Sequence, residues 1–196
     1  MTKIERNSLL STSQYQLQRK TWRERVIPFK KLRTILLGNN VSILFENEFT
    51  ARYQLQEMIR VDKSLENDPL DEELEIYNFL IPSKNSLKAT LMFEFVDPGI
   101  RETKLAQLVG VEKSVWMQVD GCKKVFARCS NTVKPANPEL ASGVYFLSFE
   151  LDDDSRQGFI NGLAVSIGID HPAYKHELEE IAPQTQVVLI EDLTSE

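Results

Sequence analysis

The sequence of 196 residues predicts a single α+β domain, in which helices pack on a mostly antiparallel or mixed sheet. Two pairs of short β-forming runs are each joined by residues that favour tight turns, at positions 38–40 and 120–121. Segments with helical spacing of apolar residues lie between these hairpins instead of alternating regularly with single strands. The sequence has no glycine-rich turn of the kind that opens a doubly wound parallel sheet. The pattern therefore favours an α+β arrangement.

A first helix is predicted after the hydroxyl residues at positions 11–13, which can cap its N-terminus. Tyr15, Trp22 and Val26 recur on one face of this helix. Pro28 is expected to end or kink it, because proline lacks the N–H that continues the helical hydrogen bonding.

A hairpin and a second helix are predicted next. The β-forming runs 33–37 and 41–45 flank Gly38-Asn39-Asn40, whose residues tolerate the positive φ angles of tight turns. Helical spacing then extends over residues 48–61. The core-facing stripe of this helix is expected to comprise Ala51, Leu55, Met58 and Ile59.

The middle of the chain is predicted to contain two helices around a central strand. Asp68-Pro69 favours a helix start, and this helix is expected to end near residue 78. The nearly continuous apolar run 87–96 indicates a strand buried on both faces. Asp97-Pro98 opens a further helix, which is expected to reach Leu108 and to close at Gly110.

The remaining strands are predicted at residues 115–119, 124–128, 143–151 and 163–169, with a short edge strand at 186–190. Asp120-Gly121 favours a tight hairpin between the first two of them. The acidic residues 152–154 suit the N-terminus of a short helix. Pro172 is expected to begin a last helix, which runs to about residue 181.

The composition is that of a folded globular protein. Hydrophobic residues make up 42% and charged residues 27% of the chain, as in ordinary globular proteins. A chain of this length buries roughly two thirds of its unfolded surface, so it needs neither disulfides nor metals to fold. No apolar run approaches the ~20 residues of a membrane-spanning helix, and the first residues lack the apolar core of a secretion signal. We therefore expect a cytoplasmic protein without a membrane segment.

The two cysteines, Cys122 and Cys129, are expected to be unpaired thiols. They are seven positions apart and are placed on one predicted strand. A strand of that length separates them by about 23 Å, whereas a disulfide needs Cα atoms about 5.5 Å apart. Their spacing also differs from the CxxC pattern of redox and zinc sites.

Charge is distributed unevenly along the chain, whose net charge is −6. Residues 19–33 contain seven basic side chains and one acidic side chain, whereas the end of the chain is acidic, including a predicted tail over 182–196. Such asymmetry indicates either an anion-binding face or packing of the basic N-terminal helix, within residues 1–30, against the acidic C-terminal part. No nucleic-acid-binding motif accompanies the basic residues, so we expect no binding to nucleic acid.

Local signatures of common enzyme classes are absent from the sequence, and the densest polar cluster is Asp170-His171-Pro172. Asp170 could orient the imidazole of His171, which would then act as a base or a metal ligand. Alternatively, Asp170 or His171 caps the helix that Pro172 begins. His176 is five residues after His171, a poor spacing for two metal ligands on one helix, so no metal site is predicted.

A second candidate is the polar stripe formed by Tyr53, Gln56, Glu57 and Arg60 on the predicted helix 48–61. One interpretation is a solvated face with an ordinary Glu57–Arg60 ion pair. The other is a ligand site, in which Arg33 joins the stripe around one concavity and His171 lies at its rim. Two arginines beside one carboxylate would attract a carboxylate or phosphate group.

Several phrases of the sequence together resemble a known family. They are Arg33-Thr34-Ile35, Leu37-Gly38, Phe45-Glu46, Tyr53-Gln54-Leu55-Gln56-Glu57-Met58-Ile59-Arg60, Tyr77-Asn78-Phe79-Leu80-Ile81-Pro82, Lys88-Ala89-Thr90-Leu91 and Asp170-His171-Pro172-Ala173-Tyr174. In this order they resemble the bacterial family catalogued as domain of unknown function 3501, over about residues 25–174. The resemblance implies no catalytic residue and no cofactor. Because members of that family are often encoded beside a rubrerythrin-like protein and an iron–sulfur protein, it implies a role near redox metabolism.

Two functions follow as competing hypotheses. The first is a non-catalytic accessory or ligand-binding protein that docks to a rubrerythrin-like or iron–sulfur redox partner. The second is a small-molecule enzyme whose site combines Glu57 and Arg60 with Asp170 and His171. The enzyme hypothesis requires the two segments to meet in space, because catalytic groups must reach one reacting centre. We favour the accessory function.

Overall fold

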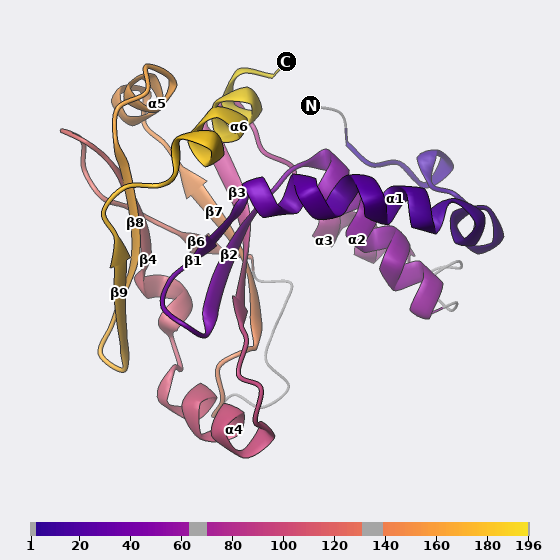
Figure 1. Ribbon diagram of the computed structural model, residues 1–196, viewed down its shortest axis with the longest axis horizontal. Coiled ribbons are helices and arrows are strands. Elements are labelled where there is room, and N and C mark those ends of the chain that lie inside the picture. Colours follow the sequence, from indigo (N-terminus) through magenta and orange to yellow (C-terminus); the bar gives the residue numbers. More distant parts are fainter. Residues whose placement is uncertain (1–2, 63–69, 131–138, 196) are drawn as a thin grey trace.

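The computed structural model describes residues 3–62, 70–130 and 139–195, and it confirms the predicted α+β class (Figure 1). Its helices are α1 (Thr12–Leu32), α2 (Glu48–Val61), α3 (Leu70–Asn78), α4 (Pro98–Gln107), α5 (Asp153–Ile160) and α6 (Pro183–Thr194), with short 3₁₀ helices at Arg6–Ser8 and Val111–Ser114. The predicted helix start at Asp68-Pro69 lies outside the described residues.

The strands form two antiparallel sheets. The five-stranded sheet has the order β1 (Thr34–Leu36), β2 (Val41–Glu46), β3 (Ser86–Phe93), β7 (Val144–Glu150) and β6 (Arg128–Cys129). The four-stranded sheet has the order β5 (Val125–Phe126), β4 (Val115–Val119), β8 (Val165–His171) and β9 (Tyr174–Leu178). Both predicted hairpins are confirmed, since β1 pairs with β2 and β4 with β5.

One apolar cluster joins the two sheets. Phe45 and Leu147 of the five-stranded sheet belong to the same buried cluster as Met117 and Ile167 of the four-stranded sheet. Leu189 of α6 belongs to the same cluster. A second cluster lies between the outer face of the five-stranded sheet and helices α2 and α3.

The predicted strand 124–128 is divided between the two sheets. Val125 and Phe126 pair with β4, whereas Arg128 and Cys129 pair with β7. Cys122 precedes β5 in the turn, so the prediction that both cysteines share one strand is wrong. Both thiols are free in the structure. Burial raises the pKa of Cys129 to about 11, which makes it a poor nucleophile at neutral pH.

Two predicted elements at the C-terminal end have the wrong type. Residues 172–181 were expected to be helical, but Tyr174–Leu178 form β9, which pairs antiparallel with β8. Proline favours the second position of a tight turn as well as the first turn of a helix, so Pro172 fits both structures. Residues 186–190 were expected to be an edge strand within an acidic tail. They belong to α6, because helical spacing turns Gln186 and Leu189 inward.

Two smaller predictions concern the N-terminal helices. Of the two alternatives for Pro28, an end to the helix is wrong, because α1 continues to Leu32. Met58 was expected in the core stripe of α2, but it is 42% exposed, while the other members of that stripe are buried.

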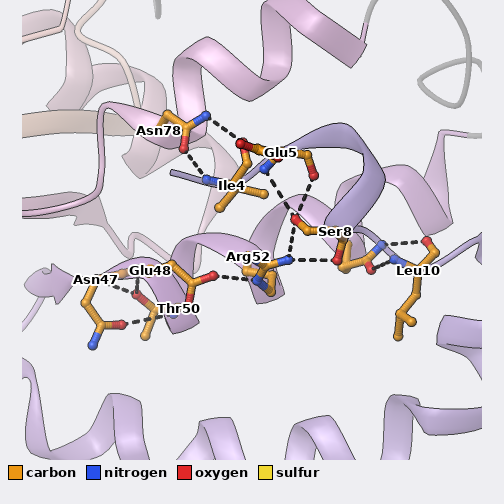
Figure 2. A network of polar contacts seen from close by, with 10 residues as sticks. Ile4, Glu5, Ser8, Leu10, Asn47, Glu48, Thr50, Arg52 and Asn78 are labelled. Carbon is orange, nitrogen blue, oxygen red and sulfur yellow. Dashed lines mark hydrogen bonds and ion pairs between the residues drawn. The ribbon is translucent and has the colours of Figure 1, made fainter. Parts of the chain in front are cut away.

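The segment before α1 lies across α2 and α3, held by two side-chain amides (Figure 2). Asn78 accepts a hydrogen bond from the Ile4 N–H at 2.8 Å and donates one to the Ile4 carbonyl at 3.0 Å. Gln56 makes the same pair of bonds with Leu10, at 2.8 and 3.2 Å. Arg52 donates to the Ser8 carbonyl at 2.9 Å. These contacts fix where α1 begins.

Within the described part of the chain, none of the helices combines the length and the apolar character that crossing a membrane would require.

Candidate functional site

Aromatic side chains hold α1 against α2. Trp22 stacks on Phe49 with ring centroids 5.5 Å apart, and Phe29 meets the same ring edge-on at 5.2 Å. At the start of α2, the Asn47 side chain accepts a hydrogen bond from the Thr50 N–H at 3.1 Å, which caps the helix. This packing brings the polar stripe of α2 beside the basic residues of α1.

Glu57 of α2 is the centre of a cluster of hydrogen bonds between the two helices. Arg19 grips the carboxylate through Nε at 2.7 Å and Nη2 at 3.0 Å. The Tyr15 hydroxyl donates to Oε1 at 2.7 Å, and Arg60 donates to Oε2 at 3.3 Å. The two carboxylate oxygens therefore accept four hydrogen bonds, and we call these four residues the Glu57 cluster.

The donors keep Glu57 ionised. Burial by itself would raise the pKa of this carboxyl, but the hydrogen bonds from Arg19 and Tyr15 outweigh burial and lower the pKa to about 2. Burial and the bond to Glu57 raise the pKa of Tyr15 far above its usual value, so its hydroxyl stays a donor.

Positive charge exceeds negative charge around this cluster. Lys30 lies with its Nζ 5.5 Å from the centroid of the Tyr53 ring. A hollow of about 400 Å³ on α1 is lined by Arg19, Lys20 and Arg23, with Glu24 as its acidic member. Arg60 Nε is buried and has no hydrogen-bond partner among the described residues.

Three of the predicted site residues lie together. Tyr53, Glu57 and Arg60 are all on α2, where Glu57 binds Arg19 of α1 and Tyr53 lies beside Lys30 of α1. The sequence did not indicate Tyr15 or Arg19 as members of the site. Tyr15 was assigned to the core face of its helix, and only the packing of α1 on α2 joins it to Glu57.

Arg33 lies elsewhere, in a buried ion pair. Its guanidinium is 1% exposed and binds Asp192 of α6 through Nη1 at 2.5 Å and Nη2 at 2.9 Å. It also donates to the Val188 carbonyl at 3.2 Å and lies over the Phe29 ring at 4.5 Å. Arg33 therefore connects α1 to α6 and is not part of the Glu57 cluster.

Asp170 and His171 lie at the turn between β8 and β9, and Figure 1 places that hairpin on the opposite side of the molecule from α2. Asp170 pairs with Lys175 at 3.0 Å on the surface. His171 Nδ1 accepts a hydrogen bond from the Ala173 N–H at 3.2 Å, which stabilises the turn. The structure thus does not bring the two segments of the enzyme hypothesis together.

A second buried carboxylate lies under α2 and α3. Glu46 of β2 is 1% exposed, and its Oε1 accepts a hydrogen bond from the Thr90 hydroxyl at 2.7 Å. Its Oε2 has no partner among the described residues. In the same described ranges, no group of three or more His, Cys, Asp or Glu side chains is arranged to hold a metal ion.

Comparison with known proteins identifies relatives without an assigned activity. A family model described as "Protein of unknown function (DUF3501)" matches residues 3–193. The chain is also similar to a solved structure from Burkholderia pseudomallei K96243, described as a novel protein of unknown function. That similarity has a TM-score of 0.90 and 37% sequence identity, and it covers 98% of this chain and 100% of the other. No curated protein matches the chain.

Proposed function

The chain belongs to the DUF3501 family of proteins of unknown function, and we propose from its own geometry that it is a single-domain, non-catalytic binding protein. Its ligand is a small molecule or group that carries a carboxylate or a phosphate. The ligand binds in the hollow on α1 that Arg19 and Arg23 line, beside the Glu57 cluster.

The observation that carries this proposal is the surplus of cations around one carboxylate. Arg19, Arg23, Lys30 and Arg60 lie along the contact between α1 and α2, and Glu57 neutralises only one of these charges. Arg60 keeps an unpartnered Nε within the described structure. Guanidinium groups bind carboxylates and phosphates through paired, charge-assisted hydrogen bonds, so the surplus favours an anionic ligand.

Glu57 is suited to positioning rather than to proton transfer. All of its nearby donors already bind its oxygens, and its pKa of about 2 is far below neutral pH. A general base works best with a pKa near the working pH. Glu57 therefore orients the arginines that receive the ligand, which favours binding over catalysis.

Isothermal titration calorimetry with inorganic phosphate and with citrate tests the binding function. The native protein should bind at least one of these anions, and Arg60→Ala should weaken that binding by about tenfold or more. Arg128→Ala, which removes an exposed arginine of β6, is the matched control and should bind normally. Unchanged binding in Arg60→Ala would contradict the proposal. Unfolding of that variant would instead identify Arg60 as a structural residue.

We further propose, on the resemblance of the sequence, that the protein works in the cytoplasm beside a rubrerythrin-like or iron–sulfur redox protein. Its two free thiols suit a reducing compartment, and the basic side chains of α1 suit an acidic partner. Co-purification at low salt, followed by iron and flavin analysis, tests this partner. Captured material without either cofactor would contradict it.

A further inference from the structure

Strand β1 is an edge of the five-stranded sheet, and one side of its backbone is unpaired. The chain pairs with β2 through Arg33, Ile35 and Leu37, as shown by the bonds from Phe45 N to Arg33 O and from Leu37 N to Val41 O. In an antiparallel pair the alternate residues point their N–H and C=O groups away from the neighbour. Thr34 and Leu36 therefore present these groups outward, and no described residue bonds to them.

This edge is apolar where it is exposed. Leu36 is 66% exposed, and Leu32, in the last turn of α1, is 43% exposed. Natural proteins commonly protect exposed strand edges with charged side chains or a covering element. Leu32 and Leu36 therefore place exposed apolar side chains beside an unpaired strand edge without a charged side chain of β1 to protect it.

A groove runs beside this edge. Its volume is about 460 Å³, and the last turn of α1 forms one wall through Pro28, Lys31 and Leu32. Thr34 forms the floor at the start of β1, and Thr185 in the first turn of α6 lies on the other wall. The groove therefore adjoins the start of β1 at Thr34.

The groove carries positive charge. Lys31 is exposed, and no described carboxylate lies within ion-pair distance of it. The first turn of α6 lines the other wall, and its N-cap residue, Ala182, provides no side-chain cap. The partial positive charge of a helix N-terminus adds to that of Lys31. An acidic side chain bound in the groove would complement the charge of Lys31 and the partial charge of the α6 N-terminus.

We propose that β1 and this groove bind an extended, acidic segment of a partner protein by strand addition. The segment pairs its backbone with Thr34 and Leu36, places apolar side chains against Leu32 and Leu36, and places a carboxylate beside Lys31. A second copy of this chain is a poor occupant, because a two-fold axis at β1 would bring the basic ends of two α1 helices together. The lining residues of this groove are distinct from the Glu57 cluster, which Tyr15 and Arg19 join from the other end of α1.

Fluorescence anisotropy with a labelled peptide of alternating glutamate and valine tests the inference. The native protein should bind it, and Leu36→Glu and Lys31→Glu should each raise the Kd by about tenfold or more. Ile100→Glu and Lys104→Glu, which change exposed residues of α4, are the matched controls and should leave the Kd unchanged. The same peptide with alternate backbone nitrogens methylated keeps its charge but cannot pair as a strand, so it should not bind.

Three results would overturn the inference. One is that the native protein does not bind the unmethylated peptide. Another is binding that is indifferent to peptide methylation and to Leu36→Glu, because charge alone would then explain it. The last is a native dimer in sedimentation equilibrium that Leu36→Glu dissociates, because the edge would then belong to a second copy. Leu36 is exposed, so circular dichroism should show Leu36→Glu folded in every case.

Discussion

The Tyr174 hydroxyl donates a hydrogen bond to the Leu37 carbonyl at 2.5 Å, and this contact joins the β8–β9 hairpin to the β1–β2 hairpin. It is possible because the neighbouring residue is Gly38. A Cβ atom there would lie 2.6 Å from Tyr174 Oη and 2.9 Å from His176 Cε1. Two of the phrases that carry the family resemblance, Leu37-Gly38 and the segment ending at Tyr174, thus meet in one structural contact between the sheets.

Gly38→Ala is expected to destabilise the protein more than Gly121→Ala. Both glycines have positive φ, at 73° and 75°, so both substitutions carry a similar backbone strain of roughly 1–2 kcal/mol. Only Gly38 also meets Tyr174, whereas a Cβ at Gly121 would have nothing within 4 Å. Urea denaturation of the two variants measures the difference. Equal losses would mean that the Tyr174 side chain moves away from the added Cβ atom without a cost in the free energy of unfolding.

Removing one partner of the Arg33–Asp192 pair is expected to cost about 3–5 kcal/mol, because a buried charge is left without its counter-charge. Both side chains are almost fully buried, at 2% and 4% exposure. Replacing both, as Arg33→Met with Asp192→Leu, should recover most of the loss. Chemical denaturation of both single variants and the double variant gives the coupling energy. A mild effect of Arg33→Ala would show that the pair is solvated in solution.

The Glu57 cluster is expected to make stability depend on pH in the acid range. The pKa of Glu57 is about 2 in the folded protein, against an ordinary value of 4.5. A depressed folded-state pKa contributes stability above the unfolded pKa, and that contribution disappears as the pH falls from about 4.5 to about 2. Glu57→Gln should therefore flatten this part of the stability curve.

Thermal unfolding across this pH range gives the measurement for Glu57. Glu24→Gln, at an exposed position on α1, provides the control and should retain the native slope. If the curves of Glu57→Gln and the native protein coincide, the hydrogen bonds to Glu57 do not persist in solution.

Thr90→Val is expected to cost roughly 1.5–3 kcal/mol, because it removes the hydroxyl that donates to the buried carboxylate of Glu46. The same substitution should cost much less in a Glu46→Met background, where no buried carboxylate needs a donor. A double-mutant cycle by urea denaturation measures this coupling. Additive effects would indicate that another group already satisfies Glu46.

The elements that the sequence predicted well have strong local signals. Helix α2 has the predicted bounds, since its apolar spacing is regular and Asn47 caps it. The segment after His171 was misassigned because Pro172 fits the first turn of a helix as well as a tight turn between strands. The spacing of Tyr174 and Leu178, four residues apart, fits one face of either structure. Local spacing alone does not distinguish these structures.

The candidate site was predictable only in part, for a related reason. Tyr53, Glu57 and Arg60 share one helix, so their proximity follows from helical geometry. The donors from α1 precede Glu57 by 42 and 38 positions, and they reach it only through the packing of two helices. Arg33 was placed near the site because it precedes α2 in the chain, but its partner in α6 is 159 positions away.

That separation has a consequence for the order of events during synthesis. The ribosome adds roughly 5–20 residues per second, so Arg33 exists for roughly 8–30 s before Asp192 is made, 159 positions later. Until then α6 is incomplete, and the Arg33 guanidinium lacks the counter-charge that allows it to be buried. The junction of α1 and β1 therefore stays hydrated on the nascent chain. Docking of α6 closes it only after Asp192 has been synthesised.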